Sequence, residues 1–365
     1  MARTERQLNR TAFTPPYHAS ERARVLHEHL TVVDLHADSL LWGRDLLVRG
    51  DRDQADVPRL IDGNVALQVF AVATKTPRHL NIERNEDDSD DIILLAVALG
   101  WPAATWRSLL TRALHLAACA DAMARRSAGR RTIIRSRANL EANLAGRTPG
   151  RPVTAGLISI EGAHALDDDP ANVEVVADAG FRMMSPTHFF DNAFGGSAHG
   201  VVKGGLTAAG REMVERMEAR RMIVDVAHAS VATIDDVLAM ATRPIVVSHT
   251  GVRGTADNAR NLSDAHLRGI ARTGGVVGIG FWDTATGGTD VAAIARAIAY
   301  AIDVAGLEHV ALGSDFDGAV AVPIDATGMV QVTDALLDQG MDEHAIRKVM
   351  GDNALRVIAE TLPSI

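Results

Sequence analysis

Eight nearly unbroken apolar runs, separated by amphipathic segments, constrain the fold of this chain more than any other feature. Such runs are typical of strands that are buried on both faces of a parallel sheet. The alternation predicts an α/β fold, a (β/α)8 TIM-type barrel, with a doubly wound sheet as the alternative. The expected strands are Val32–His36, Val65–Ala73, Ala155–Glu161, Arg182–Thr187, Met222–Ala227, Ile245–Ser248, Gly275–Phe281 and His309–Gly313.

Helical patterns lie between the strands, and several begin after a residue that can cap a helix. The expected helices are Ala208–Arg221 after Thr207, Val231–Ala241 after Ser230 and Asp264–Thr273 after Ser263. With 365 residues, 47% of them hydrophobic, the chain can form one large core. We therefore expect residues 1–365 to form a single barrel domain.

The segment 78–150 is too long for a single barrel helix. We interpret it as a helical insertion between the second and third strands, covering one side of the barrel. Within it we predict helices over Trp106–Ala124 and over the Arg-rich stretch Arg125–Arg147. The acidic run Glu83–Asp91 is most simply a solvated face.

Charge and cysteine content exclude several classes of protein. The net charge of −9, without a basic block, argues against a nucleic-acid partner. The single Cys119 cannot form an internal disulfide. Met1–Val25 lacks the apolar core of a secretion signal, and no apolar run is long enough to span a membrane. We expect a cytoplasmic protein, not associated with a membrane, and leave open whether it is a homo-oligomer.

The triplet His36-Ala37-Asp38 ends the first predicted strand. Because strand side chains alternate with period two, His36 and Asp38 are expected to point the same way. An imidazole and a carboxylate aimed at one spot can form half of a metal site. The simpler interpretation is a solvated histidine beside a carboxylate that caps a helix.

Similar side chains follow other predicted strands, which favours the metal-site interpretation. A lone histidine after a strand is more often a capping or packing residue, but here histidines follow three successive strands. In a barrel, all these strand ends lie on the face where barrel enzymes keep their active sites. The convergent set is His36, Asp38, Glu161, His188, His228, His249 and Asp315.

Nitrogen and oxygen ligands of this kind suit Zn²⁺, with Mn²⁺, Co²⁺ and Fe²⁺ as alternatives. The set is too large for one tetrahedral ion, and Glu161 is the best-placed carboxylate to bridge two. Two ions roughly 3.5–4 Å apart can hold a hydroxide at neutral pH and polarise a carbonyl. Asp315 is then left to move protons. The glycine-rich stretch Asp191–Gly205 is either an active-site loop or a plain mobile connection.

Together these motifs resemble the membrane dipeptidase (renal dipeptidase) family, a branch of the amidohydrolase-type barrels. The resemblance runs from Val32 to Ile358 and is weakest in the segment 78–150. The matching stretches are Asp34–Asp38, Ile160–Gly162, Ser185–His188, Gly205–Thr207 with Gly210, Asp225–Ser230, Val247–His249, Arg260–Asn261, Gly313–Gly318 and Gly351–Val357.

The resemblance implies a ligand set for two zinc ions. His36 and Asp38 would bind one ion, His228 and His249 would bind the other, and Glu161 would bridge them. Secreted eukaryotic relatives carry disulfides and a lipid anchor, whereas this sequence has one cysteine and no anchor signal. It therefore resembles a bacterial cytosolic member of the family.

The resemblance also implies roles in substrate binding and proton transfer. His188 would hydrogen-bond the scissile carbonyl oxygen, and Arg260 would hold the C-terminal carboxylate of the substrate. Asp315 would take a proton from the attacking water and pass it to the leaving amine. Phe281-Trp282 takes the place of a pocket-lining tyrosine of some relatives, so Trp282 is expected to contact the substrate.

The expected function is hydrolysis of dipeptides with a free C-terminal carboxylate, including those with a C-terminal D-residue, as the resemblance implies. The alternative is another amidohydrolase-type reaction, on N-acyl amino acids or lactones. Arg260 bears on this choice because a guanidinium clamp requires a carboxylate on the substrate. A metal-binding protein without activity is disfavoured because Asp315 is present beside all five ligands.

Overall fold

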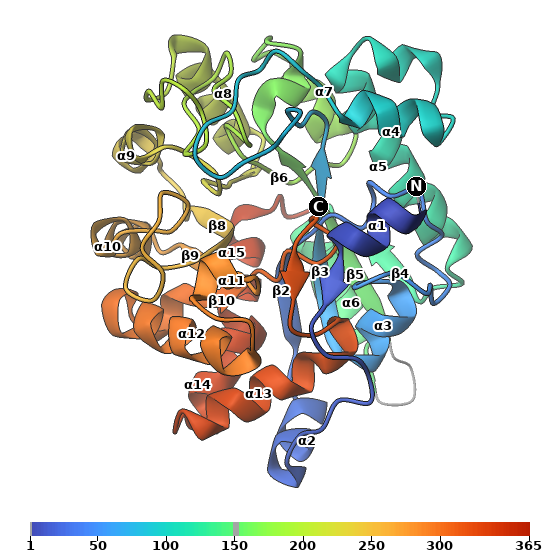
Figure 1. Cartoon of the computed structure of the whole chain (residues 1–365), viewed down its shortest axis with the longest axis vertical. Helices are drawn as coiled ribbons and strands as arrows, with labels where there is room; N and C mark the ends of the chain where they lie inside the picture. The colour runs from blue at the N-terminus through green and yellow to red at the C-terminus, as the bar shows by residue number, and fades with distance from the viewer. Residues whose placement is uncertain (1, 149–152) are drawn as a thin grey trace.

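The computed structural model describes residues 2–148 and 153–365. Its centre is a parallel nine-stranded sheet, in which eight strands follow one path in the order β7-β6-β5-β3-β2-β10-β9-β8 (Figure 1). These strands are β2 (Val32–Ala37), β3 (Val65–Ala73), β5 (Thr154–Glu161), β6 (Met183–Met184), β7 (Ile223–Val224), β8 (Val246–Thr250), β9 (Val276–Ile279) and β10 (Val310–Leu312).

The two ends of this path meet. Asp225, next to β7, pairs with Val246 of β8 in a single parallel bridge, and the Val226 N–H donates to the Val246 carbonyl at 2.9 Å. The first strand of the barrel, β2, lies between β3 and the last strand of the barrel, β10. The eight strands therefore form a nearly closed TIM-like barrel in chain order. The barrel prediction is confirmed, and the doubly wound alternative is wrong.

One buried apolar cluster fills the barrel and explains why its strands read as continuous apolar runs. The cluster takes residues from all eight strands and from helix α15 (Asn353–Thr361). Because the Asn353 amide donates to the Val310 carbonyl at 2.9 Å, α15 lies at the end of the barrel where the strands begin. The C-terminal ends of the strands are left for the site. The strand residues of the cluster are Val33, Leu35, Leu67, Val69, Ala155, Leu157, Met183, Ile223, Val246, Val276 and Ala311.

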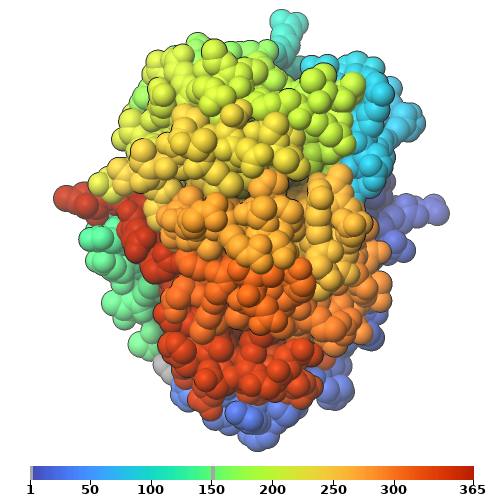
Figure 2. All heavy atoms as spheres, turned by 90° about the vertical axis from the view of Figure 1, so that its left-hand side faces the viewer, coloured from blue at the N-terminus to red at the C-terminus, as the bar shows by residue number. Residues whose placement is uncertain are grey.

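A second buried cluster lies between the barrel and its outer helices. Figure 2 shows that segments of the later part of the chain are stacked in chain order down one side of the molecule, from green through yellow and orange to red. Thr207, Ser230 and Ser263 each accept the backbone N–H three residues further on, as the capping prediction requires. The outer helices are α3 (Val57–Asp62), α7 (Asn172–Asp178), α8 (Ala208–Ala219), α9 (Val231–Met240), α10 (Asp264–Arg272), α12 (Val291–Ala305), α13 (Met329–Asp338) and α14 (Glu343–Arg347).

Between β3 and β5 the chain forms both helices and a strand. The predicted helix over Trp106–Ala124 is α5, which begins at Leu109 after a 3₁₀ turn. The prediction of a helix over Arg125–Arg147 is wrong for the first part of this stretch, whereas α6 lies within its second part. Ala128 and Gly129 have positive φ angles of 53° and 81°, which end the helical path, and the chain then pairs with β5. Residues 149–150 of this segment lie outside the described residues. The elements are α4 (Ile92–Ala98), η1 (Ala103–Trp106), α5 (Leu109–Arg126), β4 (Arg131–Ile133) and α6 (Arg137–Ala145).

The N-terminal residues pack beside the strand that follows β10. Helix α1 (Ala2–Leu8) leads into β1 (Arg10–Thr11), which pairs in parallel with β11 (Ala321–Val322). None of the described helices has the length and apolar character needed to cross a membrane. The remaining elements are α2 (Glu21–Glu28), η2 (Ala163–Leu166), α11 (Asp283–Thr286), η3 (Leu307–His309), η4 (Ala326–Gly328) and the π-helical turn η5 (Lys348–Asp352).

Candidate metal centre

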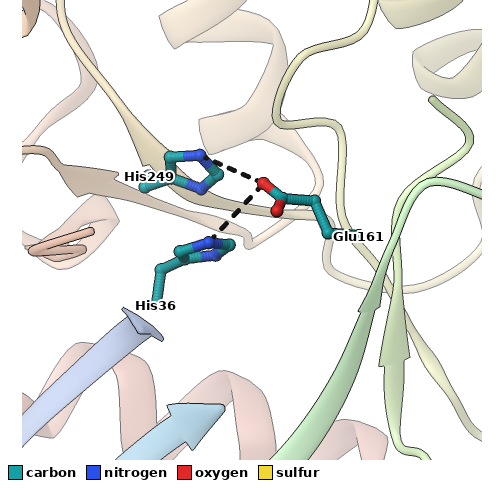
Figure 3. A group of neighbouring side chains, drawn as sticks. All are labelled: His36, Glu161 and His249. Atoms are coloured by element: carbon teal, nitrogen blue, oxygen red, sulfur yellow. Dashed lines mark ion pairs between the residues drawn. The ribbon is translucent and has the colours of Figure 1, made fainter. Parts of the chain in front are cut away.

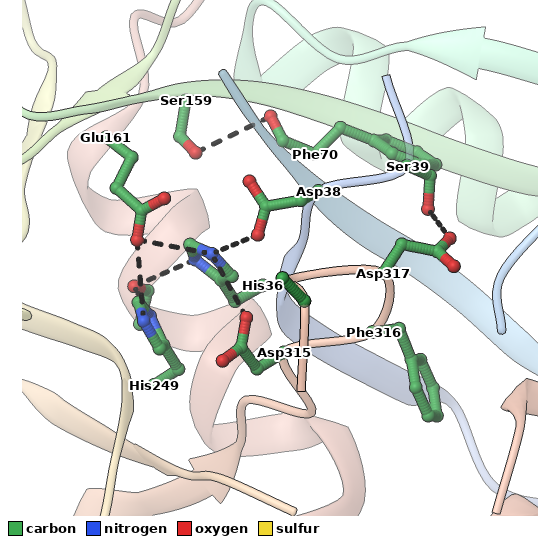
Figure 4. A network of polar contacts seen from close by, with 12 residues as sticks. His36, Asp38, Ser39, Phe70, Ser159, Glu161, His249, Asp315, Phe316 and Asp317 are labelled. Carbon is green, nitrogen blue, oxygen red and sulfur yellow. Dashed lines mark hydrogen bonds and ion pairs between the residues drawn. The ribbon is translucent and has the colours of Figure 1, made fainter. Parts of the chain in front are cut away.

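The seven residues of the predicted convergent set lie together at the C-terminal end of the barrel, and all are buried. They come from the ends of six different strands, from β2 to β10, so the fold itself concentrates them. Figure 4 shows five of them, His36, Asp38, Glu161, His249 and Asp315. The arrangement follows from the parallel barrel, in which every strand delivers its last residues to the same face.

Glu161 occupies the centre of the cluster. Its Oε1 atom lies 3.5 Å from the Nε2 atoms of both His36 and His249 (Figure 3). The same oxygen lies 3.1 Å from His228 Nε2. Its other oxygen, Oε2, lies 3.4 Å from His188 Nε2. One carboxylate at the end of β5 therefore faces four imidazole nitrogens from four other strands.

The nitrogen of His36 that faces Glu161 also faces two other carboxylates. This Nε2 atom lies 3.3 Å from Asp38 Oδ2 and 3.9 Å from Asp315 Oδ1 (Figure 4). Burial would lower the pKa of His36, but these carboxylates and Glu161 raise it to about 10. Burial raises the pKa of Glu161 well above its ordinary value, and repulsion from Asp38 adds to the rise. Burial, with repulsion from Asp38, also raises the pKa of Asp315 to about 8.

The other imidazoles of the cluster are neutral. Burial lowers the pKa of His188, His228 and His249 well below the ordinary value. The Nε2 atoms of His228 and His249 lie 2.9 Å apart. Asp38 Oδ1 is buried without a hydrogen-bond partner among the described residues. Neutral imidazoles converging on crowded carboxylates are the donors that divalent cations such as Zn²⁺ require.

Three overlapping groups of these residues bring their ligand atoms within 4.8 Å of one another. The residues present therefore fit a metal centre. The groups are His36 with Glu161 and His249, Glu161 with His188 and His228, and His36 with Asp38 and Asp315.

His199 is a site residue that the sequence did not identify. Its Nε2 atom lies 3.0 Å from His228 Nδ1, and its own Nδ1 lies 2.7 Å from the Ile82 carbonyl oxygen. Because a carbonyl only accepts, His199 carries its proton on Nδ1 and accepts from His228 Nδ1–H. His228 Nε2 is then left with a free lone pair directed at Glu161.

The glycine-rich loop 191–205 supplies His199, and it is fixed by hydrogen bonds. The Asp191 carboxylate accepts from the backbone N–H groups of Ser197 at 2.8 Å and Val202 at 2.7 Å. A Cβ atom at Gly200 would lie 2.0 Å from Asp191 Oδ1, so a larger residue there would displace this carboxylate from its hydrogen bonds. Of the two interpretations of this loop, the structure favours the one in which it forms part of the site.

The backbone is strained at two of the site residues. His228 has a φ angle of 62° and Asp315 a φ angle of 63°. Left-handed conformations cost energy in residues other than glycine and are concentrated at functional sites. In both residues this conformation accompanies a side chain directed into the buried cluster.

Arg260 and Trp282 line the same pocket as the cluster. The pocket has a volume of about 910 Å³. The Arg260 side chain is buried, donates from Nη2 to the His249 carbonyl at 2.6 Å, and lies 5.7 Å from the Trp282 ring centroid. Burial lowers the pKa of Arg260 to about 10, so the guanidinium stays charged at neutral pH.

A buried set of imidazoles and carboxylates at the C-terminal mouth of a parallel barrel is typical of a metal-dependent hydrolase. Comparison with known proteins narrows this class. Residues 20–362 match the family model of the membrane dipeptidases, peptidase family M19. The chain belongs to this family, and it is a metallo-dipeptidase.

Individual relatives and solved structures resemble the chain over much of its length. An uncharacterized protein of the pqqA 5′ region of Klebsiella pneumoniae is 34% identical over 248 residues, covering 64% of this chain and 89% of that protein. The crystal structure of dipeptidase AC, a family M19 metallopeptidase, has a TM-score of 0.76 at 25% identity, covering 92% and 99% of the two chains. A Rhodobacter sphaeroides metallopeptidase, liganded with a phosphinate mimic of L-Ala-D-Ala, has a TM-score of 0.74 at 25% identity, covering 91% and 99%.

Proposed function

We propose that the chain hydrolyses L,L and L,D dipeptides that carry a free C-terminal carboxylate, with two divalent metal ions, Zn²⁺ in the first place. The observation that carries this proposal is the position of Glu161, whose carboxylate lies between ligands contributed by both halves of the barrel. A carboxylate in such a place can serve two ions at once.

In this proposal, His36 and Asp38 hold one ion, His228 and His249 hold the other, and Glu161 contacts both. The short distances from Glu161 Oε1 to three of the imidazoles support this assignment. When bound, the ions supply Lewis-acid activation of water and of the substrate carbonyl. The carboxylates of Asp38, Glu161 and Asp315 repel one another. Bound cations would relieve this repulsion, which favours metal binding by the folded chain.

His188 is placed to stabilise charge on the substrate carbonyl oxygen. His188 Nε2 lies 3.4 Å from Glu161 Oε2, so this imidazole faces the same carboxylate as the proposed ligand histidines. Since burial keeps this imidazole neutral, it can donate a hydrogen bond without holding a competing charge. A donor directed at a developing oxyanion lowers the barrier to attack.

Asp315 is placed to move the proton that the reaction requires. Its carboxylate lies in the cluster, 3.9 Å from His36 Nε2, but it is not needed to complete the five-ligand set. We assign it to accept a proton from the attacking water and to deliver it to the nitrogen of the leaving amine. General acid–base catalysis of this kind contributes about 10²–10⁴-fold to a rate.

Arg260 is placed to bind the C-terminal carboxylate, with Trp282 beside it. Among the described residues its side chain makes one hydrogen bond, to the His249 carbonyl, and most of its N–H donors remain available. A guanidinium held in this way can bind a carboxylate through two parallel hydrogen bonds. The pocket therefore favours a substrate with a free acid at one end.

We also propose that residues 1–365 act as one barrel domain, in which the segment 78–150 is an insertion that walls the substrate pocket. Several of its residues line that pocket, including Asn81, Ile82, Ile92 and Leu95. This gives the segment a role in substrate binding in addition to packing.

An assay of metal-reconstituted protein tests the proposal. The substrates are L,L and L,D dipeptides, N-acyl amino acids and lactones. We expect hydrolysis of both kinds of dipeptide, because the bound mimic in the Rhodobacter sphaeroides structure represents an L,D dipeptide. Cleavage of N-acyl amino acids or lactones, with no cleavage of any dipeptide, would contradict it. Activity on L,L dipeptides alone would contradict only the part of the proposal that concerns L,D dipeptides.

A further inference from the structure

The outer wall of the substrate pocket is built from apolar side chains that solvent reaches. Leu8, Leu80 and Leu94 all line the pocket and are 40%, 44% and 59% exposed. They come from three separate stretches of the chain, two of which flank the acidic run 83–91. Single exposed leucines are ordinary, but several gathered at one pocket mouth indicate a binding surface.

Two members of this apolar rim lie across the barrel mouth from Arg260. Leu80 and Leu94 follow β3, the second strand of the barrel, whereas Arg260 follows β8, the sixth. In an eight-stranded barrel these strands are opposite each other. Figure 1 agrees, with α4 on one side of the barrel and α10 on the other. A dipeptide whose carboxylate is held by Arg260 therefore extends its N-terminal residue toward the rim.

Helix α1, which carries Leu8, is fixed in place although it precedes the residues that match the family model. The buried Glu5 carboxylate lies 3.1 Å from Arg44 Nη1 and 2.8 Å from Arg52 Nε. The pairing of β1 with β11 holds the following residues. The helix thus adds to the pocket a wall that the family-matching segment 20–362 does not provide.

The acidic groups on this side of the pocket are already paired. Asp91 lies 3.3 Å from Arg78 Nε, and Asp317 lies 2.7 Å from Arg44 Nη2. The pocket lining near these paired groups includes further apolar side chains, among them Ile82 and Leu95. The volume of about 910 Å³ is near the upper end of the range for small-molecule sites, which is far more than a pair of alanines needs.

We propose that the rim formed by Leu8, Leu80 and Leu94 binds the side chain of the substrate's N-terminal residue. The enzyme then selects dipeptides that begin with a large aliphatic or aromatic residue. This inference rests on the proposed function, because the position of the N-terminal residue follows from the carboxylate clamp at Arg260.

The test compares kcat/KM for Ala-Ala, Leu-Ala, Phe-Ala and Ser-Ala in the wild type and in two rim variants, Leu8→Ser and Leu94→Ser. The matched controls lie on the same helices outside the pocket lining, Gln7→Ser on α1 and Val97→Ser on α4, where Val97 is 52% exposed. Melting temperatures of all variants identify any loss of folding.

We expect the wild type to prefer Phe-Ala and Leu-Ala over Ala-Ala and Ser-Ala by about 10-fold or more. Each rim variant should lose at least about threefold more activity on Phe-Ala than on Ala-Ala, and the controls should show no such difference. Equal use of all four substrates, or rim variants that match their controls, would overturn the inference while leaving the dipeptidase function intact. Hydrolysis of none of the four would instead contradict the proposed function.

Discussion

The Nε2 atom of His199 lies 3.0 Å from the Nδ1 atom of His228. Since His199 Nδ1 is held by the Ile82 carbonyl, this contact fixes the tautomer and orientation of a proposed metal ligand. We predict that His199→Leu lowers metal affinity about 10–100-fold, measured by competition with a chromophoric chelator. The exposed His18, replaced in the same way, is the control. Unchanged affinity in His199→Leu would show that the contact does not orient the ligand.

Glu161 should govern the occupancy of both metal positions. We predict two equivalents of divalent metal per chain in the reconstituted wild type, measured by elemental analysis. In Glu161→Gln the content of both positions should fall together, because one carboxylate serves both and an amide is a weaker ligand. One equivalent at saturation in the wild type would rule out the two-ion assignment.

Arg260 should act mainly in substrate binding. We predict that Arg260→Met raises KM for free dipeptides, with a smaller change in kcat, because the variant loses a charge-assisted pair with the substrate carboxylate. The wild type should cleave a C-terminally amidated dipeptide poorly. If the amide is cleaved as well as the free acid, Arg260 does not bind the carboxylate.

Substitution of Asp315 should impair proton transfer without impairing metal binding. We predict that Asp315→Asn lowers kcat by about 10²–10⁴-fold, or about 3–5 kcal/mol in barrier height, because the general base is lost. Metal content and KM should change little. A variant that loses metal in proportion to activity would instead make Asp315 a ligand, as its place near His36 and Asp38 would allow.

The metal-free protein should lose stability as the pH rises from 7.5 to 8.5, a range that lies above the ordinary pKa of histidine, so the buried neutral histidines such as His188 contribute little to the slope. Burial raises the pKa of Asp315 from 3.8 to about 8, so the folded chain retains a proton that the unfolded chain has lost. The raised pKa of His36, about 10, acts in the same direction. Each retained proton lowers the free energy of unfolding by roughly 1.4 kcal/mol per pH unit up to the folded pKa.

Urea denaturation of chelator-treated protein at several pH values measures this slope. Asp315→Asn removes one titrating group from the cluster, so its slope should be smaller than that of the wild type. Added metal should stabilise the wild type more at pH 8.5 than at pH 7.5, because cations favour the ionised carboxylates. A wild-type stability that rises over this range would contradict the prediction.

Most of the barrel could be predicted from local sequence patterns. Strands such as Val65–Ala73 are buried on both faces, so their apolar runs are unbroken, and helix caps such as Thr207 mark where helices begin. The end of α5 at Arg126 and the strand β4 could not be predicted in this way. That short stretch becomes a strand only by pairing with β5, and its own residues carry no signal of the partner.

The sequence by itself determined that His36, Glu161, His249 and their companions share one face, because parallel strands in a barrel end on the same side. Tertiary structure alone decided that His199 contacts His228 and that Leu8 of α1 reaches the pocket mouth. These residues lie on a loop and on a terminal helix, whose paths depend on hydrogen bonds and ion pairs with distant parts of the chain. Strand ends follow from a repeating local pattern, whereas such long-range contacts follow only from the packed fold.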